Sequence, residues 1–107
     1  MIESSPLRDA IHGNARFVAK AGKEAELQRA LLDVVLATRR EEGNLRADMF
    51  RSKDQPSIFY LVSAWRDDAA LESHFQQPYV RSFLADATAL QAETSSVGFG
   101  VMVSEPA

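Results

Sequence analysis

Apolar and polar residues alternate along three stretches of the chain, which is typical of half-buried β-strands, and a fourth stretch is a short apolar run rich in β-branched and aromatic residues, which also indicates a strand. Near the end of the chain, for example, Val97, Phe99 and Val101 alternate with Gly98 and Gly100. Two further stretches carry apolar residues three and four positions apart, which predicts amphipathic helices. The pattern predicts strands at residues 10–20, 44–51, 58–65 and 95–103, and helices at residues 23–42 and from residue 67 to about residue 92.

Turn and capping residues separate these elements. Gly22 makes the first turn, Gly43 ends the first helix, and the polar residues 52–57 supply a hairpin loop. Asp67 is a suitable N-cap for the second helix. Pro78 should break that helix in two, because proline lacks the N–H that a helix interior needs but fits the first turn of a new helix.

The resulting order is βαββαβ, with the second helix broken at Pro78. Short right-handed crossovers close such a chain into a ferredoxin-like α+β fold, a four-stranded antiparallel sheet with its helices on one face. The third strand is apolar on both sides, with Phe59 and Leu61 on one and Tyr60 and Val62 on the other. Because an apolar sheet face needs cover, we expect a homodimer that packs sheet to sheet.

Composition narrows the class of protein. With 107 residues the chain can form one domain, and we predict a flexible arm at residues 1–9 and a single domain at residues 10–107. The net charge of −3, with Lys and Arg scattered, argues against a nucleic-acid partner. No apolar run approaches the roughly 18 residues of a membrane span, and the start does not read as a signal peptide. We expect a cytoplasmic protein, which the lack of cysteine suits.

Candidate chemistry concentrates in residues 58–83, which hold the only tryptophan, one of the two histidines and both tyrosines. His74 shares a helix face with Leu71, so its imidazole should point inward, where it can take a proton from a phenol or an enolisable ketone and return it. The alternative is a histidine that is hydrogen-bonded within the core or at its rim. His12 is expected at the surface.

Trp65 and the two tyrosines each have a possible role in the site and a possible role in packing. Trp65 can form a flat wall for an aromatic substrate and donate its indole N–H, or it can simply seal the end of a strand. Tyr60 and Tyr79 can orient a substrate hydroxyl, or they can pack their rings and keep their tips in water.

Asn44 and Arg46 are expected on the same side of their strand, where an amide or guanidinium can stabilise an enolate or phenolate oxygen. For Arg46 an ion pair with Asp48 is the favoured alternative. Other chemistries lack their residues: there is no convergent set of metal ligands, no serine elbow, and no phosphate, flavin or nicotinamide motif. We therefore expect neither a metal nor a cofactor.

Three segments resemble the antibiotic biosynthesis monooxygenase superfamily of dimeric α+β barrels. They are ARFVAKAGKEAEL leading into the first helix, EEGNLRADMFRS after it, and FYLVSAWRDDAALESHFQQPYVRSF in the centre, and the resemblance covers about residues 14–103. Their order and spacing, rather than any single motif, carry the likeness. The resemblance implies a cofactor-free pocket between sheet and helices, as in the quinol and anthrone monooxygenases.

Two other branches of the superfamily are also similar. The isomerase of phosphorylated autoinducer-2 has a segment like EEGNLRADMF and a histidine at the position of His74, but this chain has Tyr79 where that branch has a second histidine. The haem-degrading branch uses an Asn and a His where this chain has Ala15 and Leu84, so the resemblance does not imply haem.

We therefore predict a cofactor-independent monooxygenase that oxidises a small aromatic, quinol or polyketide-like substrate with O2. His74, Asn44 and Trp65 form the predicted catalytic set, and the predicted substrate-binding residues are Phe17, Arg46, Tyr60, Phe75, Tyr79 and Phe83. Two alternatives remain open: an isomerase of a small dicarbonyl or hydroxyketone, and a non-catalytic dimeric ligand-binding module.

Overall fold

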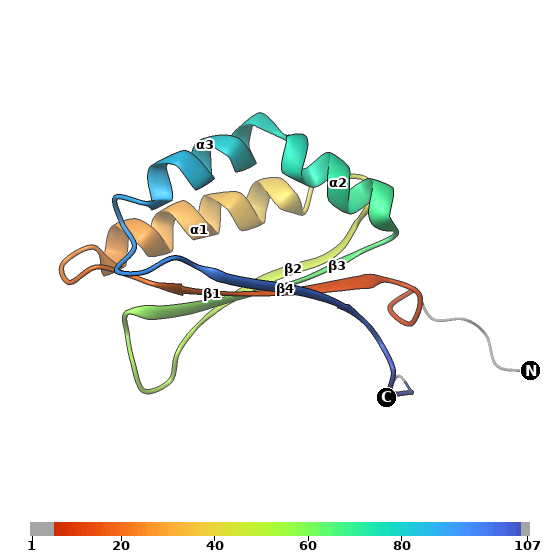
Figure 1. Cartoon of the computed structure of the whole chain (residues 1–107), viewed down its shortest axis with the longest axis horizontal. Helices are drawn as coiled ribbons and strands as arrows, with labels where there is room; N and C mark the ends of the chain where they lie inside the picture. Colours follow the sequence, from red (N-terminus) through yellow and green to blue (C-terminus); the bar gives the residue numbers. More distant parts are fainter. Residues whose placement is uncertain (1–5, 106–107) are drawn as a thin grey trace, which may run out of the picture.

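The computed structural model describes residues 6–105, which form one sheet and three helices. In chain order the elements are β1 Ile11–Val18, α1 Glu24–Thr38, β2 Asn44–Arg51, β3 Ile58–Trp65, α2 Asp68–Gln76, α3 Pro78–Ala87 and β4 Ser96–Val101. This order confirms the predicted ferredoxin-like α+β fold, including the helix break, since only Gln77 separates α2 from α3 (Figure 1). Of the predicted arm, residues 1–5 lie outside the described part and residues 6–9 form turns and a bend.

The four strands lie in the order β2-β3-β1-β4, and all neighbouring pairs are antiparallel. All three helices cover the same face of this sheet (Figure 1). The register places Met49, Leu61, Ala15 and Val97 in one row across the four strands. Because directly paired residues point to the same side, the register tells which residues face the helices.

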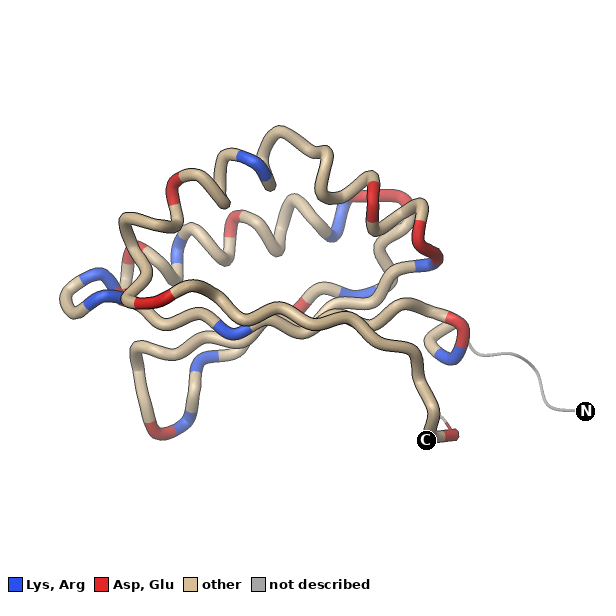
Figure 2. The backbone as a smooth tube through the Cα atoms, in the orientation of Figure 1, with Lys and Arg blue, Asp and Glu red and all other residues tan. Residues whose placement is uncertain are grey.

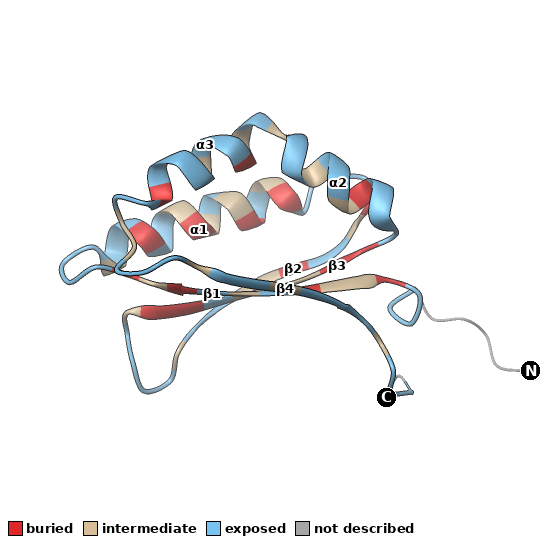
Figure 3. Cartoon of the chain, viewed as in Figure 1, coloured by how far each residue is buried: buried red, intermediate tan, exposed pale blue. Residues whose placement is uncertain are grey.

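The core lies between the helix layer and the sheet (Figure 3). Leu27, Leu31 and Val35 recur at intervals of four along α1 and are buried. Leu27 and Leu31 pack in one cluster with the buried rings of Phe17 and Phe59, which come from β1 and β3. Each such side chain contributes about 1.5–3 kcal/mol when it leaves water, so this stripe fixes α1 on the sheet.

The first helix is shorter than predicted, because it ends at Thr38 instead of residue 42. After Thr38 the backbone tightens into turns: Arg40 N–H donates to Ala37 O, and Glu41 N–H donates to Thr38 O. The Arg39 side chain donates from Nε to Ala47 O at 2.8 Å and so ties this turn to β2. The second helical region and the last strand also end early, at residues 87 and 101.

Gly43 is required where this turn meets α2. A Cβ at Gly43 would lie 2.2 Å from the Cβ of Ala70, whereas a Cβ at Gly100 would meet nothing within 4 Å. We expect Gly43→Ala to lower the free energy of unfolding by about 1–3 kcal/mol, because α2 or the turn must move apart. The control Gly100→Ala should change it little. Urea denaturation of both variants measures the difference, and equal stabilities would contradict the close approach.

The face of the sheet that carries no helix is partly apolar. Phe50 lies opposite Tyr60, and both rings are exposed. The same register places Arg16 next to Tyr60, and it places Asp48 and Asn14 on either side of Val62. This face is therefore a mixture of aromatic and polar side chains, and we refer to it as the free face.

A second exposed apolar region lies at the edge strand β4. Val97, Phe99 and Val101 point to the helix side of the sheet, since they pair with Ala15, Gly13 and Ile11 of β1. They nevertheless remain exposed, with Phe99 at 45%, and β4 is exposed along most of its length (Figure 3). We call these three residues the β4 flank.

Candidate active site

Local signals hold His74 at the end of α2. Asp67 caps the helix by accepting the N–H of Ala70 at 2.9 Å, and this hydrogen bond lowers the pKa of the Asp67 carboxyl below its usual value. At the other end of α2, the His74 ring lies 4.5 Å from the Trp65 ring, centroid to centroid. Trp65 is the buried last residue of β3. The end of a strand and the end of a helix therefore place the imidazole on the indole.

Two further side chains complete a polar cluster around His74. His74 Nδ1 lies 2.7 Å from Glu41 Oε2, and the Tyr79 hydroxyl bonds to the same oxygen. The Tyr79 oxygen also lies 3.0 Å from Thr38 Oγ1. The His74 and Glu41 side chains are each only 13% exposed, so water competes weakly for these contacts. We call these residues the His74–Glu41–Tyr79 cluster.

The contacts assign a donor to each hydrogen bond. An ionised carboxylate only accepts, so Tyr79 donates its hydroxyl proton to Glu41, and His74 donates from Nδ1–H. Thr38 then donates to the Tyr79 oxygen. The lone pair of the neutral imidazole is left at Nε2, and Glu41 stabilises the imidazolium that forms when Nε2 takes a proton. The arrangement is suited to a general base.

Tyr79 is held in its neutral form. Burial raises the pKa of its hydroxyl above the usual value near 10, and the hydrogen bond to the Glu41 carboxylate raises it further. Because the pKa of Tyr79 is higher in the folded protein than in the unfolded chain, Tyr79 stabilises the fold at every pH below its pKa in the unfolded chain. This contribution is lost as the pH rises through its pKa in the folded protein.

In an ultraviolet pH titration, we expect Tyr79→Phe to leave the absorbance rise near pH 10 unchanged from wild type. A smaller rise near pH 10 would contradict the raised pKa.

Aromatic rings continue from His74 towards the β4 flank. The Phe75 ring lies 5.3 Å from the His74 ring and 5.9 Å from the Phe99 ring, with both pairs edge to face. Phe75 and Phe99 are partly exposed. A flat apolar molecule can therefore lie against these rings close to the imidazole.

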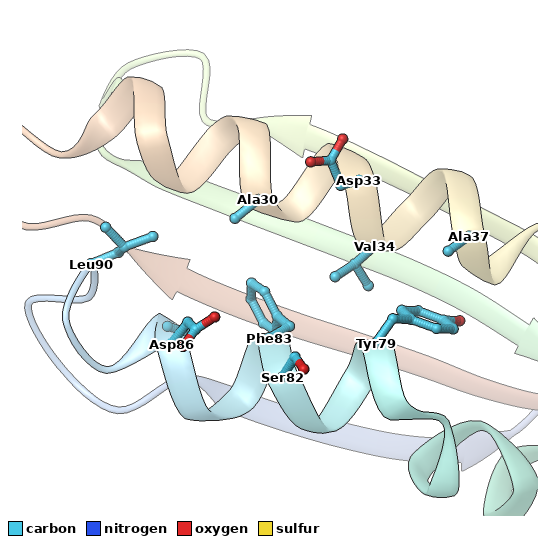
Figure 4. A pocket seen from close by; sticks show the side chains of 10 residues that line it. Ala30, Asp33, Val34, Ala37, Tyr79, Ser82, Phe83, Asp86 and Leu90 are labelled. Carbon is cyan, nitrogen blue, oxygen red and sulfur yellow. The ribbon is translucent and has the colours of Figure 1, made fainter.

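A separate hollow lies between α1 and α3 (Figure 4). It has a volume of about 290 Å³, and Tyr79 and Phe83 form part of its wall. The Phe83 ring packs edge to face on Phe17 at 5.9 Å. Neither Trp65 nor His74 lines this hollow. The predicted aromatic residues are thus divided: Trp65 and Phe75 lie beside His74, Phe83 lines the hollow with Phe17 packed behind it, and Tyr79 reaches both places.

Comparison with known proteins settles the family. The family model described as "Antibiotic biosynthesis monooxygenase" matches residues 10–86, most of the chain. The chain belongs to the antibiotic biosynthesis monooxygenase family. A curated relative from Bacillus subtilis (strain 168), named "Putative monooxygenase YcnE", is 28% identical over 71 residues, which cover 66% of this chain and 75% of the relative.

Solved structures agree with the fold of this family member. The crystal structure of PA3566 from Pseudomonas aeruginosa has a TM-score of 0.84 and 26% identity, covering 92% of this chain and 98% of that chain. Protein SO0527 from Shewanella oneidensis has a TM-score of 0.81 and 28% identity, covering 87% of this chain and 90% of that chain. The recognition made from the three sequence segments is confirmed.

Two of the remaining predicted site residues, Asn44 and Arg46, lie on opposite faces of the sheet in this family member. Asn44 and Arg46 were expected on one side, and this was wrong, because Leu45 bulges out of β2 between them. Asn44 pairs with Trp65 on the helix side, and its amide donates to Arg46 O at 3.0 Å. Arg46 lies on the free face with Tyr60, away from His74.

The favoured alternative for Arg46, an ion pair with Asp48, is confirmed. Its Nε donates to Asp48 at 2.9 Å, and this hydrogen bond lowers the pKa of the Asp48 carboxyl, to which Arg39 adds a second contact. The indole N–H of Trp65 lies 3.3 Å from Ser63 Oγ, so it already has an acceptor within the protein.

Sequence reasoning missed Glu41 and Thr38. A helix running to residue 42 would have carried Glu41 onward along the helix surface, whereas the turn after Thr38 brings its carboxylate to His74. The available signal was Gly43, whose lack of a side chain lets this turn approach α2. The sequence alone does not show that this turn brings Glu41 to His74, because that contact depends on how the turn packs against α2.

Two other features are absent from residues 6–105 of this family member. No group of three or more His, Asp or Glu side chains is placed there to hold a metal ion. In the same range, no helix has both the length and the apolar character to cross a membrane. Basic and acidic residues are interspersed along the helices and loops (Figure 2).

Proposed function

We propose that this protein is a cofactor-independent monooxygenase of small phenols, quinols or anthrones, with His74 as its general base. The contact between His74 Nδ1 and Glu41 carries the proposal, because it leaves Nε2 as the basic atom and stabilises the charge that proton transfer creates. The family match and the name of the Bacillus subtilis relative, "Putative monooxygenase YcnE", support an oxygenase.

The aromatic substrate lies against Phe75 and the β4 flank, with its acidic hydroxyl or methylene directed at Nε2. His74 removes the proton, and the electron-rich anion reacts with O2. For an anthrone, the methylene carbon becomes a carbonyl with one oxygen atom of O2, and the other atom leaves as water. The protein supplies position and stabilises charge, and the oxidant is O2 itself. Trp65 supports the ring of His74 from the end of the sheet, and Asn44 lies opposite Trp65 on the neighbouring strand.

We further propose that the protein acts as a homodimer through the free face. The rings of Phe50 and Tyr60 are exposed there, and a second copy offers the same rings in return. Arg46 and Asp48 then lie close to this interface rather than near His74. Small-angle scattering or analytical ultracentrifugation would reveal the mass, and Phe50→Glu should shift it to that of one chain.

A non-catalytic ligand-binding module is the second candidate. One observation favours it: five of the best-formed recesses among residues 6–105 are open to solvent, and none of these five is lined by Trp65 or His74. In that case His74 and Glu41 form a structural pair that holds α2 to the turn after α1. An isomerase would use the same base without oxygen.

Oxygen uptake separates these functions. Purified protein is incubated with an anthrone or a naphthoquinol in an oxygen electrode, and ¹⁸O₂ shows whether one oxygen atom enters the product. Uptake above the rate of spontaneous oxidation, with label in the product, is the expected result. Turnover of a hydroxyketone without oxygen uptake would identify an isomerase, and binding without turnover would identify the module.

A further inference from the structure

The hollow between α1 and α3, which we call the α1–α3 groove, has an apolar wall. Small side chains of α1 form one side, and larger side chains from α3 and the loop after it form the other (Figure 4). The apolar members are Ala30, Val34, Ala37, Tyr79, Phe83, Ala87 and Leu90. Its volume of about 290 Å³ lies near the lower limit of about 300 Å³ for small-molecule sites, so it suits a small ligand.

The polar residues of the groove are acidic or neutral. Asp33 of α1 and Asp86 and Ser82 of α3 line it, and no Lys, Arg or His is among its lining residues. Asp33 has an exposed partner on its own helix, Arg29, at 3.4 Å. Asp86 has no ion-pair partner within residues 6–105. The groove thus combines apolar walls with one carboxylate, that of Asp86, which has no ion-pair partner among residues 6–105.

The position of Asp86 is unfavourable for the helix that carries it. It lies in the last turn of α3, where the helix dipole is negative and where no basic residue balances it. A carboxylate at this end therefore does not help to stabilise α3. A cation bound in the groove would remove this repulsion, which is an argument for a ligand of positive charge.

We propose that the α1–α3 groove binds a small organic ammonium ion with an apolar body. The body lies between Val34 and the rings of Tyr79 and Phe83, and the ammonium group pairs with Asp86 at the rim. Ser82 offers a hydroxyl that can accept a second ammonium hydrogen. This site is distinct from the proposed place of oxidation, because the groove opens between the helices whereas the β4 flank lies at the edge of the sheet.

Three ligands of similar shape test the charge requirement. Isothermal titration at pH 7 compares 2-phenylethylamine, its neutral analogue 2-phenylethanol, and the anion 3-phenylpropanoate. The amine should bind about tenfold more tightly than the alcohol, and the anion should bind most weakly. Equal affinities for amine and alcohol, or no saturation up to about 10 mM amine, would overturn the proposal.

Substitution of Asp86 tests whether the ammonium group binds at the rim of the groove. Asp86→Asn should weaken amine binding about tenfold while the melting temperature stays the same or rises, since the repulsion at the end of α3 is removed. The matched control Glu72→Gln removes one exposed charge from α2, outside the groove, and should change the affinity by less than about twofold. Equal losses in both variants would mean that only net charge attracts the amine. Both experiments measure binding alone, so their outcome is independent of whether the protein is an oxygenase.

Discussion

Replacing His74 with glutamine is expected to lower kcat/KM for quinol or anthrone oxidation by about 10²–10⁴-fold. Glutamine keeps a polar side chain of similar reach but cannot take a proton. The loss should appear mainly in kcat, because proton removal belongs to the transition state whereas the aromatic contacts of Phe75 remain. Oxygen uptake under saturating substrate measures kcat directly.

Two further variants show whether the loss of activity in His74→Gln is specific to His74 and its partner. His12→Gln removes the other histidine, whose Nε2 contacts Leu7 O, and should leave the rate unchanged. Glu41→Gln should lower kcat by about tenfold or more with little change in KM, because Glu41 positions His74 and stabilises its charged form. A folded His74→Gln variant that oxidises at the wild-type rate would remove His74 from the mechanism.

Trp65→Ala should lower the free energy of unfolding by about 3–5 kcal/mol. Trp65 is 1% exposed and joins the end of β3 to α2 through the His74 ring, so its removal leaves a cavity where sheet and helix meet. Domains of this size have a total stability of about 5–15 kcal/mol, so the variant should remain folded only marginally. Urea denaturation followed by circular dichroism measures the change.

Two controls set the scale for Trp65. Leu36→Ala truncates an exposed side chain of α1 and should change stability by no more than about 0.5 kcal/mol. Trp65→Phe keeps an aromatic ring and should lose less stability than Trp65→Ala. If Trp65→Ala cost less than about 1 kcal/mol but removed activity, the indole would be a wall for the substrate rather than a packing residue.

The fold was accessible from the sequence because its signals are local. Alternation along the strands and the four-residue spacing of Leu27, Leu31 and Val35 each depend on neighbours within a few positions. Pro78 predicted the break between α2 and α3 for the same reason, since the missing N–H acts within one turn. The end of α1 was predicted too late, because Arg39 reaches across to β2 and closes the helix from outside.

The candidate site was accessible only in part. Helix spacing indicated that His74 points inward, and the structure places it against Trp65. Glu41 reaches His74 from a segment far away in the chain, so no local pattern could indicate the contact. The faces of Asn44 and Arg46 were predicted incorrectly, because the bulge at Leu45 adds one residue and reverses the alternation.

Tyr79 connects the two binding sites proposed above. Its hydroxyl holds Glu41, and its ring forms part of the wall of the α1–α3 groove. A ligand that displaces the ring must therefore alter the support of His74. Thermodynamic reciprocity then requires that an amine changes the affinity for the oxidisable substrate by the same factor as that substrate changes the affinity for the amine.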